Sequence, residues 1–337
     1  MDASAPLPLV EVRDLLVSFV SREATVSAVN GVSFSLMPGE VLCIIGESGS
    51  GKSVTMRSLL RLHPPRRTVI RGSIRVGAYD ILSLGDRAMN GVRGAVISMV
   101  FQEPMTALDP VYTIGEQIAE AVLRHEGGTR QAAMARALEL LELVKVPSPE
   151  QRLRAYPHEL SGGLRQRAMI AVALSCRPSL LLADEPTTAL DATVQIQVLV
   201  MLRRLQREFG MGVIFVTHDL GVAAQIADRV AVMYAGRIIE YGRAADVLLR
   251  PAHPYTLGLL ASTVHGQTRD AEIEAIPGSP PDLRALPPGC SFAPRCRFAM
   301  PACLTEFPSS VGIGPGHTAS CFRTEAVRQE APAHVAG

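Results

Sequence analysis

The residues best suited to chemistry stand in a glycine-rich run near the N-terminus. Residues 46–53 read Gly-Glu-Ser-Gly-Ser-Gly-Lys-Ser, which fits the pattern G-x-x-x-x-G-K-[ST]. Small residues let successive backbone N–H groups face a phosphate, the lysine reaches the terminal phosphates, and the last serine can bind Mg²⁺. A chance glycine loop is the alternative, but an apolar segment precedes the run and a helical segment follows it. The run predicts a nucleotide site made by Gly46, Glu47, Ser48, Gly49, Ser50, Gly51, Lys52 and Ser53.

Lys52 stands out from the other basic residues. The chain has 33 lysines and arginines, but only Lys52 and Lys145 are lysines. A compact ammonium fits a phosphate cradle in a way that a forked guanidinium does not. The retained lysine therefore supports the phosphate-binding interpretation.

Two adjacent carboxylates follow an apolar segment later in the chain. Residues 180–186 read Leu-Leu-Leu-Ala-Asp-Glu-Pro, which is typical of a buried strand with Asp184 and Glu185 at its carboxyl end. Beside a phosphate-binding loop, Asp184 would hold the Mg²⁺ shell and Glu185 would polarise an attacking water as general base. A solvated turn is the alternative interpretation of this short pattern.

A second candidate anion site opens a helix at residues 160–166, Leu-Ser-Gly-Gly-Leu-Arg-Gln. Ser161 can cap this helix, whereas glycines in a first turn lower its stability and need a reason. Close backbone approach to an anion is such a reason. Since the chain has one phosphate loop, a second anion site at Ser161, Gly162, Gly163 and Gln166 implies a second nucleotide.

The elements around these motifs alternate between strand and helix. Strands are expected at residues 9–12, 15–19, 32–36, 41–45, 180–183 and 213–216, and helices at 52–62, 132–144, 161–176 and 194–209. Thr129 is a plausible N-cap for the second of these helices. The alternation predicts an α/β fold with a mostly parallel sheet flanked by helices.

The overall composition limits the partners and the cellular location that we expect for the protein. Hydrophobic residues make up 47%, charged residues 19%, and the net charge is +1, so nothing favours nucleic acid as a partner. No apolar run reaches the ~18 residues that span a bilayer, and the N-terminus lacks the pattern of a signal peptide. We expect the chain on the cytoplasmic side, with membrane contact through partners.

The composition changes after about residue 265. Eight prolines fall between Pro277 and Pro308, and Cys290, Cys296, Cys303 and Cys321 gather in this part of the chain. In a reducing compartment such a cluster predicts a metal centre rather than disulfides. The spacing C-x₅-C-x₆-C-x₁₇-C lacks the tight pairs of structural zinc sites, which favours a [4Fe–4S] cluster, with Zn²⁺ as the alternative. Cys43 and Cys176 lie in apolar segments and are expected in the core.

Taken together, the motifs resemble the ABC ATPase family. The further matching features are Gln102 after a strand, Ala189-Leu190-Asp191, and His218 in Val216-Thr217-His218-Asp219. The resemblance implies a P-loop ATPase with a mixed sheet core and a helical subdomain. The expected division is a nucleotide-binding domain at 1–264, with the helical subdomain at about 103–178, and a cysteine-containing extension at 265–337.

The resemblance also implies roles for single residues. ATP would lie between the phosphate loop of one subunit and the Leu-Ser-Gly-Gly segment of another in a head-to-tail dimer. Gln102 would sense Mg²⁺ and the γ-phosphate and couple to membrane subunits, and His218 would contact the γ-phosphate. Phe19 stands where the family has an aromatic side chain stacked on adenine, with a core phenylalanine as the alternative.

A narrower resemblance is to the ATP-binding subunits of oligopeptide and dipeptide importers. It rests on residues 101–110, 156–160 and 253–256 and on the cysteine-containing extension. It implies a motor subunit on the cytoplasmic side of the cell (inner) membrane. The implied partners are a second, non-identical ABC ATPase subunit, two membrane permeases and an extracytoplasmic solute-binding protein.

Other functions compete with this interpretation. An importer of nickel or another small solute shares much of the pattern, and a soluble ABC ATPase outside transport is a further alternative. Only 57 residues separate Gln102 from Leu160, too few for the long coiled-coil insertion of repair proteins. A nucleic-acid-binding zinc module is disfavoured because aromatic residues make up 4% of the chain.

Overall fold

The computed structural model describes residues 7–188, 190–262 and 275–330. Ala189 and the domain boundary expected near residue 265 lie outside these residues. The chain divides into two compact units. The first contains residues 7–9, 36–40 and 83–215, and the second contains 10–35, 41–82 and the described residues from 216 onward.

Two buried parallel strands form the centre of the first unit. Strand β6 (Ile97–Val100) pairs with β7 (Leu180–Asp184) from Ile97 opposite Leu180 to Val100 opposite Ala183. All residues of both strands are buried, as the continuous apolar run in β7 predicts. Because the strands are parallel and in register, the residues that follow them emerge at the same edge.

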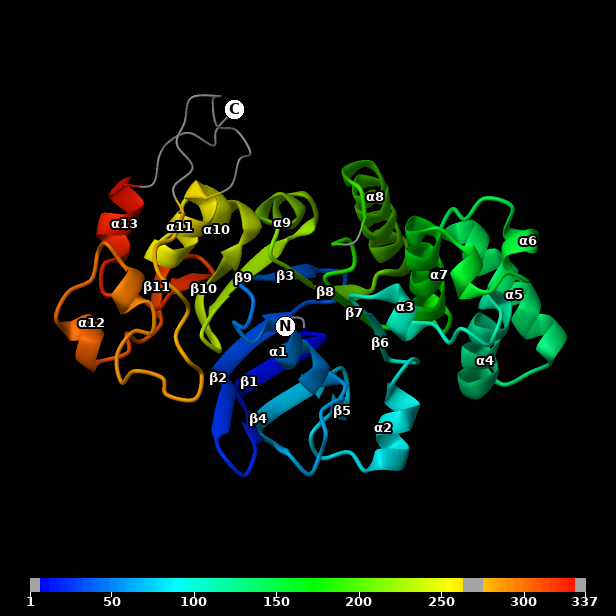
Figure 1. Ribbon diagram of the computed structural model, residues 1–337, viewed down its shortest axis with the longest axis horizontal. Coiled ribbons are helices and arrows are strands. Elements are labelled where there is room, and N and C mark those ends of the chain that lie inside the picture. Colours follow the sequence, from blue (N-terminus) through cyan, green and yellow to red (C-terminus); the bar gives the residue numbers. More distant parts are fainter. Residues whose placement is uncertain (1–6, 189, 263–274, 331–337) are drawn as a thin grey trace, which may run out of the picture. The chain divides into compact units, whose positions relative to one another are not determined.

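A group of packed helices makes up most of the rest of the first unit (Figure 1). Helix α4 (Ile114–Glu126) begins with a capping box between Thr113 and Glu116. Helix α5 (Arg130–Leu143) begins after Thr129, whose hydroxyl accepts from the N–H of Ala132, so this predicted N-cap is confirmed. The other elements of this unit are α2 (Asp86–Val92), α3 (Pro104–Ala107), α6 (Pro149–Arg152), η1 (Pro157–Glu159), α7 (Gly162–Leu174) and α8 (Ala192–Phe209).

The second unit contains a four-stranded sheet in the order β2-β1-β4-β5. Strand β1 (Val10–Val20) is continuous, whereas the sequence predicted two strands over the same residues. The predicted break is a bulge: the register against β4 shifts between Arg13 and Leu16, and Asp14 has φ 47°. The other strands are β2 (Thr25–Leu36), β4 (Thr68–Val76) and β5 (Tyr79–Asp80).

The second sheet of this unit is mixed. Strand β3 (Val41–Ile45) is parallel to β9 (Arg229–Tyr234), and β10 (Arg237–Arg243) is antiparallel to β9. The cysteine-containing extension adds β12 (His317–Ala319) and β11 (Val311–Gly314) to the same sheet. The extension is therefore joined to the body of the unit by backbone pairing, which its proline-rich sequence did not predict.

A buried polar contact reinforces that junction. The carboxylate of Glu240, on β10, accepts from the N–H groups of Ala252 and His253, and His317 Nε2 lies 2.9 Å from it. The remaining elements of this unit are α1 (Lys52–Leu59), α9 (Leu220–Ile226), α10 (Ala244–Leu249), α11 (Pro254–Ala261), η2 (Ala293–Arg295), α12 (Ala302–Thr305) and α13 (Thr324–Glu330). Strand β8 (Gly212–Thr217) contributes residues to both units. The combination of parallel and antiparallel pairs with helices is the predicted α/β architecture.

Candidate functional site

The glycine-rich run lies between strand β3 and helix α1, as predicted. Gly46 and Gly51 have φ values of 150° and 100°, which side chains rarely adopt. A Cβ on Gly46 would lie 2.2 Å from the carbonyl oxygen of Met233, and one on Gly51 would lie 2.5 Å from that of Ala28. Backbone contacts within the second unit therefore require glycine at both positions.

The polar side chains of Lys52 and Ser50 are buried within the glycine-rich run. Lys52 is 5% exposed, and its ammonium donates to the carbonyl oxygens of Gly46 at 2.6 Å and Glu47 at 2.9 Å. Ser50 is buried, and its hydroxyl has no hydrogen-bond partner among the described residues. A buried polar atom of this kind needs a partner, and a phosphate oxygen or a water would provide one. Ser53 follows Lys52 in the first turn of α1 and is half-buried.

Two further predicted residues belong to the second unit. Phe19, on β1, is half-buried, and its ring meets that of His63 edge-on with centroids 5.5 Å apart. Burial lowers the pKa of His63 below its ordinary value. His218 is exposed directly after β8. The next residue, Asp219, caps α9 by accepting from two backbone N–H groups.

In the first unit, the structure brings Gln102 and Glu185 together. Asp184 is the buried last residue of β7, and half-buried Glu185 follows it. The amide Nε2 of Gln102 donates to Oε2 of Glu185 at 3.5 Å. Glu185 has φ 45°, a conformation that costs a non-glycine residue free energy and is concentrated at functional sites. The hydrogen bond from Gln102 thus restricts the orientation of the carboxylate.

The two glycines of the Leu-Ser-Gly-Gly segment differ in their surroundings. Ser161 is the exposed N-cap residue of α7. A Cβ on Gly162 would meet no described atom within 4 Å, whereas one on Gly163 would lie 2.9 Å from Cγ1 of Val194. Packing against α8 therefore explains why position 163 is a glycine. No contact of this kind with the described residues explains the glycine at position 162. Gln166 is buried, with its Nε2 unpartnered among the described residues.

The four cysteines of the extension line one small cavity of about 10 Å³. Its walls also include the aromatic residues Phe292, Phe298 and Phe322. All six cysteines of the chain are free thiols, and burial raises the pKa of Cys290 and raises those of Cys296 and Cys321 to about 11. The four cysteines that the sequence analysis assigned to one site therefore lie around the same cavity.

The cavity meets some of the requirements of a metal centre and not others. Four thiols are a suitable donor set for zinc or an iron–sulfur cluster. However, no group of three or more His, Cys, Asp or Glu side chains in the described part of the chain is arranged so that it could hold a metal ion. The cavity has room for about one water-sized atom. As they are arranged here, the thiols therefore do not form a ready site for either group, and binding one would require the thiols and the loops that carry them to move.

Two residues near the phosphate loop were given no role from the sequence. The hydroxyl of Tyr255 accepts from the N–H of Glu47 at 2.7 Å, and the guanidinium of Arg295 pairs with the carboxylate of Glu47. Tyr255 lies in one of the segments that resemble peptide importers, and Arg295 stands next to Cys296. Neither position carries a pattern that indicates a contact with the loop.

None of the helices in the described part of the chain combines the length and the apolar character that a membrane-spanning segment needs. The sequence matches the ABC transporter family over residues 29–188. It also matches the oligopeptide/dipeptide transporter C-terminal region over residues 239–303. The chain belongs to the ABC transporter family.

Named relatives share nearly the full length of the chain. The dipeptide transport ATP-binding protein DppD of Bacillus subtilis is 49% identical over 93% of this chain and 94% of its own length. The oligopeptide transport ATP-binding protein OppD of Salmonella typhimurium is 48% identical over 95% and 96%. The dimeric structure of MJ0796, a bacterial ABC transporter cassette, has a TM-score of 0.63 and 28% identity, covering 70% of this chain and 98% of the other. The predicted family and fold are confirmed.

Proposed function

We propose that this chain is the ATP-hydrolysing motor subunit of an ABC importer for dipeptides or oligopeptides. The observation that carries the proposal is the similarity along nearly the full length of the chain to proteins named for dipeptide and oligopeptide transport. The match of residues 239–303 to the C-terminal region of such transporters supports the peptide assignment over nickel or other solutes.

In this proposal, residues 46–53 hold the phosphates of ATP, and Phe19 contacts the adenine. Ser53, Gln102 and Asp184 hold Mg²⁺, Glu185 acts as general base, and His218 contacts the γ-phosphate. The glycines required at positions 46 and 51 support the phosphate loop. The hydrogen bond from Gln102 supports Glu185 as the residue that orients water.

The proposed assembly contains a second ABC ATPase subunit, in a heterodimer. Ser161, Gly162, Gly163 and Gln166 then act on nucleotide held by that partner, and this chain's own phosphate loop is completed by the partner's segment. The exposed and uncrowded Gly162 supports a role between subunits. Two permeases and a solute-binding protein complete the importer, and the chain lies peripherally on the cytoplasmic side of the membrane.

Cys290, Cys296, Cys303 and Cys321 are proposed to bind a metal centre, a [4Fe–4S] cluster in preference to Zn²⁺. The convergence of the four cysteines on one cavity supports a shared site, and their wide spacing in the sequence is the reason for preferring the cluster. When bound, the centre would cross-link a segment rich in proline and add to the free energy of its folding. The residues themselves supply four thiols from separate turns of the extension.

Membrane attachment tests the transport function. The chain is expressed in cells alone or together with its two candidate permeases, and the membrane fraction is sedimented. We expect the chain in the pellet only when both permeases are present. Equal distribution under the two conditions would favour a soluble ABC ATPase outside transport.

A further inference from the structure

We infer that Arg295 of the extension is a positioning residue for the phosphate loop and that it sets the affinity of the chain for ATP. The inference rests on the proposed nucleotide site at residues 46–53. Its basis is a partly buried ion pair between Arg295 and Glu47. Glu47 is the second residue of the loop, and 248 positions separate it from Arg295 in the sequence.

The ion pair has two parallel hydrogen bonds. The two terminal nitrogens of Arg295 donate to the two carboxylate oxygens of Glu47 at 2.8 and 3.0 Å. The side chain of Arg295 is 6% exposed and that of Glu47 is 26% exposed. A bidentate pair fixes the orientation of both planar groups, and partial burial protects it from screening by salt.

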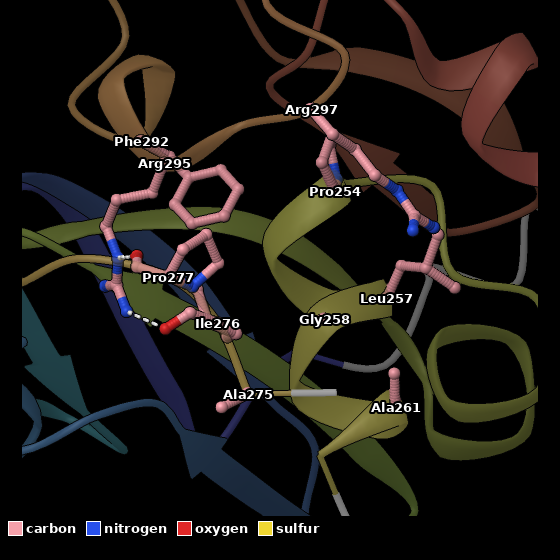
Figure 2. Close-up of a pocket in the computed structure, with 10 residues that line it drawn as sticks. All are labelled: Pro254, Leu257, Gly258, Ala261, Ala275, Ile276, Pro277, Phe292, Arg295 and Arg297. Atoms are coloured by element: carbon pink, nitrogen blue, oxygen red, sulfur yellow. Dashed lines mark hydrogen bonds between the residues drawn. The ribbon is translucent and has the colours of Figure 1, made fainter. Parts of the chain in front are cut away.

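Arg295 is itself anchored in the extension. Figure 2 shows its Nε and a terminal nitrogen donating to the carbonyl oxygens of Pro277 and Ile276, at 2.7 and 3.4 Å. It also donates to the hydroxyl of Tyr234 at 3.2 Å, and its guanidinium lies 5.9 Å from the ring centroids of Tyr234 and Phe292. The position of this side chain therefore depends on the fold of the extension.

The backbone of Glu47 is held as well. Its N–H donates to Tyr255, which is fully buried, with its ring centroid 4.6 Å from that of Tyr234 and 5.4 Å from that of Phe292. The carbonyl oxygen of Glu47 accepts from Lys52. Aromatic residues from the core and the extension thus support the same loop residue that Arg295 holds by its side chain.

The charges of Glu47 and Arg295 link this contact to the affinity for ATP. A carboxylate in a loop that binds a polyanion repels the phosphates, and the repulsion is strongest where water is partly excluded. Arg295 neutralises the carboxylate and keeps it turned toward the extension. Loss of Arg295 would leave an uncompensated negative charge on the loop, so ATP should bind more weakly.

A double-mutant cycle tests the inference with the full-length chain. ATP affinity in the presence of Mg²⁺ is measured for the wild type, R295Q, E47Q and the double variant, each checked for folding by circular dichroism. We expect R295Q to weaken ATP binding roughly tenfold, about the effect of one uncompensated partly buried charge. The effect of R295Q is also measured in the E47Q background, where adding E47Q to R295Q should restore most of the affinity that R295Q loses, because the uncompensated charge is gone. A purely structural role for Arg295 would not give this rescue.

Two further variants make the result decisive. Arg297 lies two residues along the same segment, on the other side of the pocket in Figure 2, and pairs with Glu330 at 2.5 Å. R297Q should leave ATP affinity unchanged. If R295Q does not fold, R295K replaces it in the cycle. Lysine keeps the positive charge but cannot make the two parallel hydrogen bonds of a guanidinium. We expect R295K to lose less ATP affinity, and E47Q to reduce that loss again.

The inference is overturned if R295Q binds ATP like the wild type. It is also overturned if R295Q lowers the ATP affinity by the same factor with and without E47Q. Lys52→Ala separates this outcome from a failure of the proposed site. If Lys52→Ala abolishes binding while R295Q has no effect, the nucleotide site stands and the role of Arg295 is wrong. If Lys52→Ala binds ATP normally, the site at residues 46–53 is wrong, and the inference is overturned with it.

Discussion

The side-chain amide of Gln102 lies 3.5 Å from the carboxylate of Glu185, although 83 positions separate the two residues in sequence. Each follows one of two adjacent parallel strands, β6 and β7, whose last paired residues are Val100 and Ala183. This arrangement gives the candidate base a neutral hydrogen-bond donor, which orients the carboxylate without quenching its charge.

Glu185→Gln tests the assignment of the general base. The substitution keeps the shape of the side chain and removes its ability to take a proton. We expect the steady-state rate of ATP hydrolysis in the assembled complex to fall by about 10²–10⁴-fold while ATP binding stays intact. Gln102→Ala should lower the rate less, because Gln102 positions the carboxylate and does not take a proton. A Glu185→Gln complex with nearly normal hydrolysis would show that the base lies elsewhere.

Gly162→Asp tests the contact with nucleotide on a second subunit. The aspartate would place a negative charge beside phosphates bound to the partner, so we expect normal ATP binding by the single chain and loss of the ATP-dependent dimer. Gly162→Asn is the matched control, since it has nearly the same shape without the charge, and it should retain more dimer. The measurement is formation of the dimer with the second ATPase subunit, with and without ATP, in a hydrolysis-deficient background.

Gly162 is a better position for this test than Gly163, because a side chain there adds charge without disturbing the packing of the chain. At Gly163, even a Cβ would approach a methyl group of Val194 to 2.9 Å and disturb the contact with α8. A defect there would have two explanations. Equal dimerisation of Gly162→Asp and the wild type would contradict the proposed role of the segment.

Metal analysis tests the cysteine site. After anaerobic purification we expect brown protein with about four irons per chain, as for a [4Fe–4S] cluster. Cys303→Ser should lose the iron, because each cysteine supplies one ligand. Cys176→Ser is the control, since Cys176 lies in the first unit and donates to the carbonyl oxygen of Ala121. One zinc per chain without iron would rule out the cluster and keep the four-cysteine site, and metal-free folded protein would rule out the site.

Local patterns in the sequence predicted much of the site. The phosphate loop, the buried strand before Asp184 and the N-cap at Thr129 depend on neighbouring residues, and the structure has each of them at the predicted place. Such features depend on backbone conformation and on short-range periodicity. They can therefore be inferred without knowledge of the tertiary fold.

The missed features depend on contacts between distant residues. The bulge at Asp14 forms against β4, and the pairing of β12 with β10 joins residues about eighty positions apart. The ion pair between Glu47 and Arg295 leaves no periodic pattern, because each residue also fits an exposed polar position. The assignment of Gly163 needed the position of Val194 on another helix.

Peptide uptake by a reconstituted complex is the most direct test of the central claim. The chain is assembled with its second ATPase subunit, its two permeases and the solute-binding protein in lipid vesicles supplied with ATP. We expect accumulation of di- or oligopeptides that requires ATP and is lost with Glu185→Gln in this chain. Uptake that is unchanged by Glu185→Gln, or a complex that hydrolyses ATP and moves no peptide, would contradict the account.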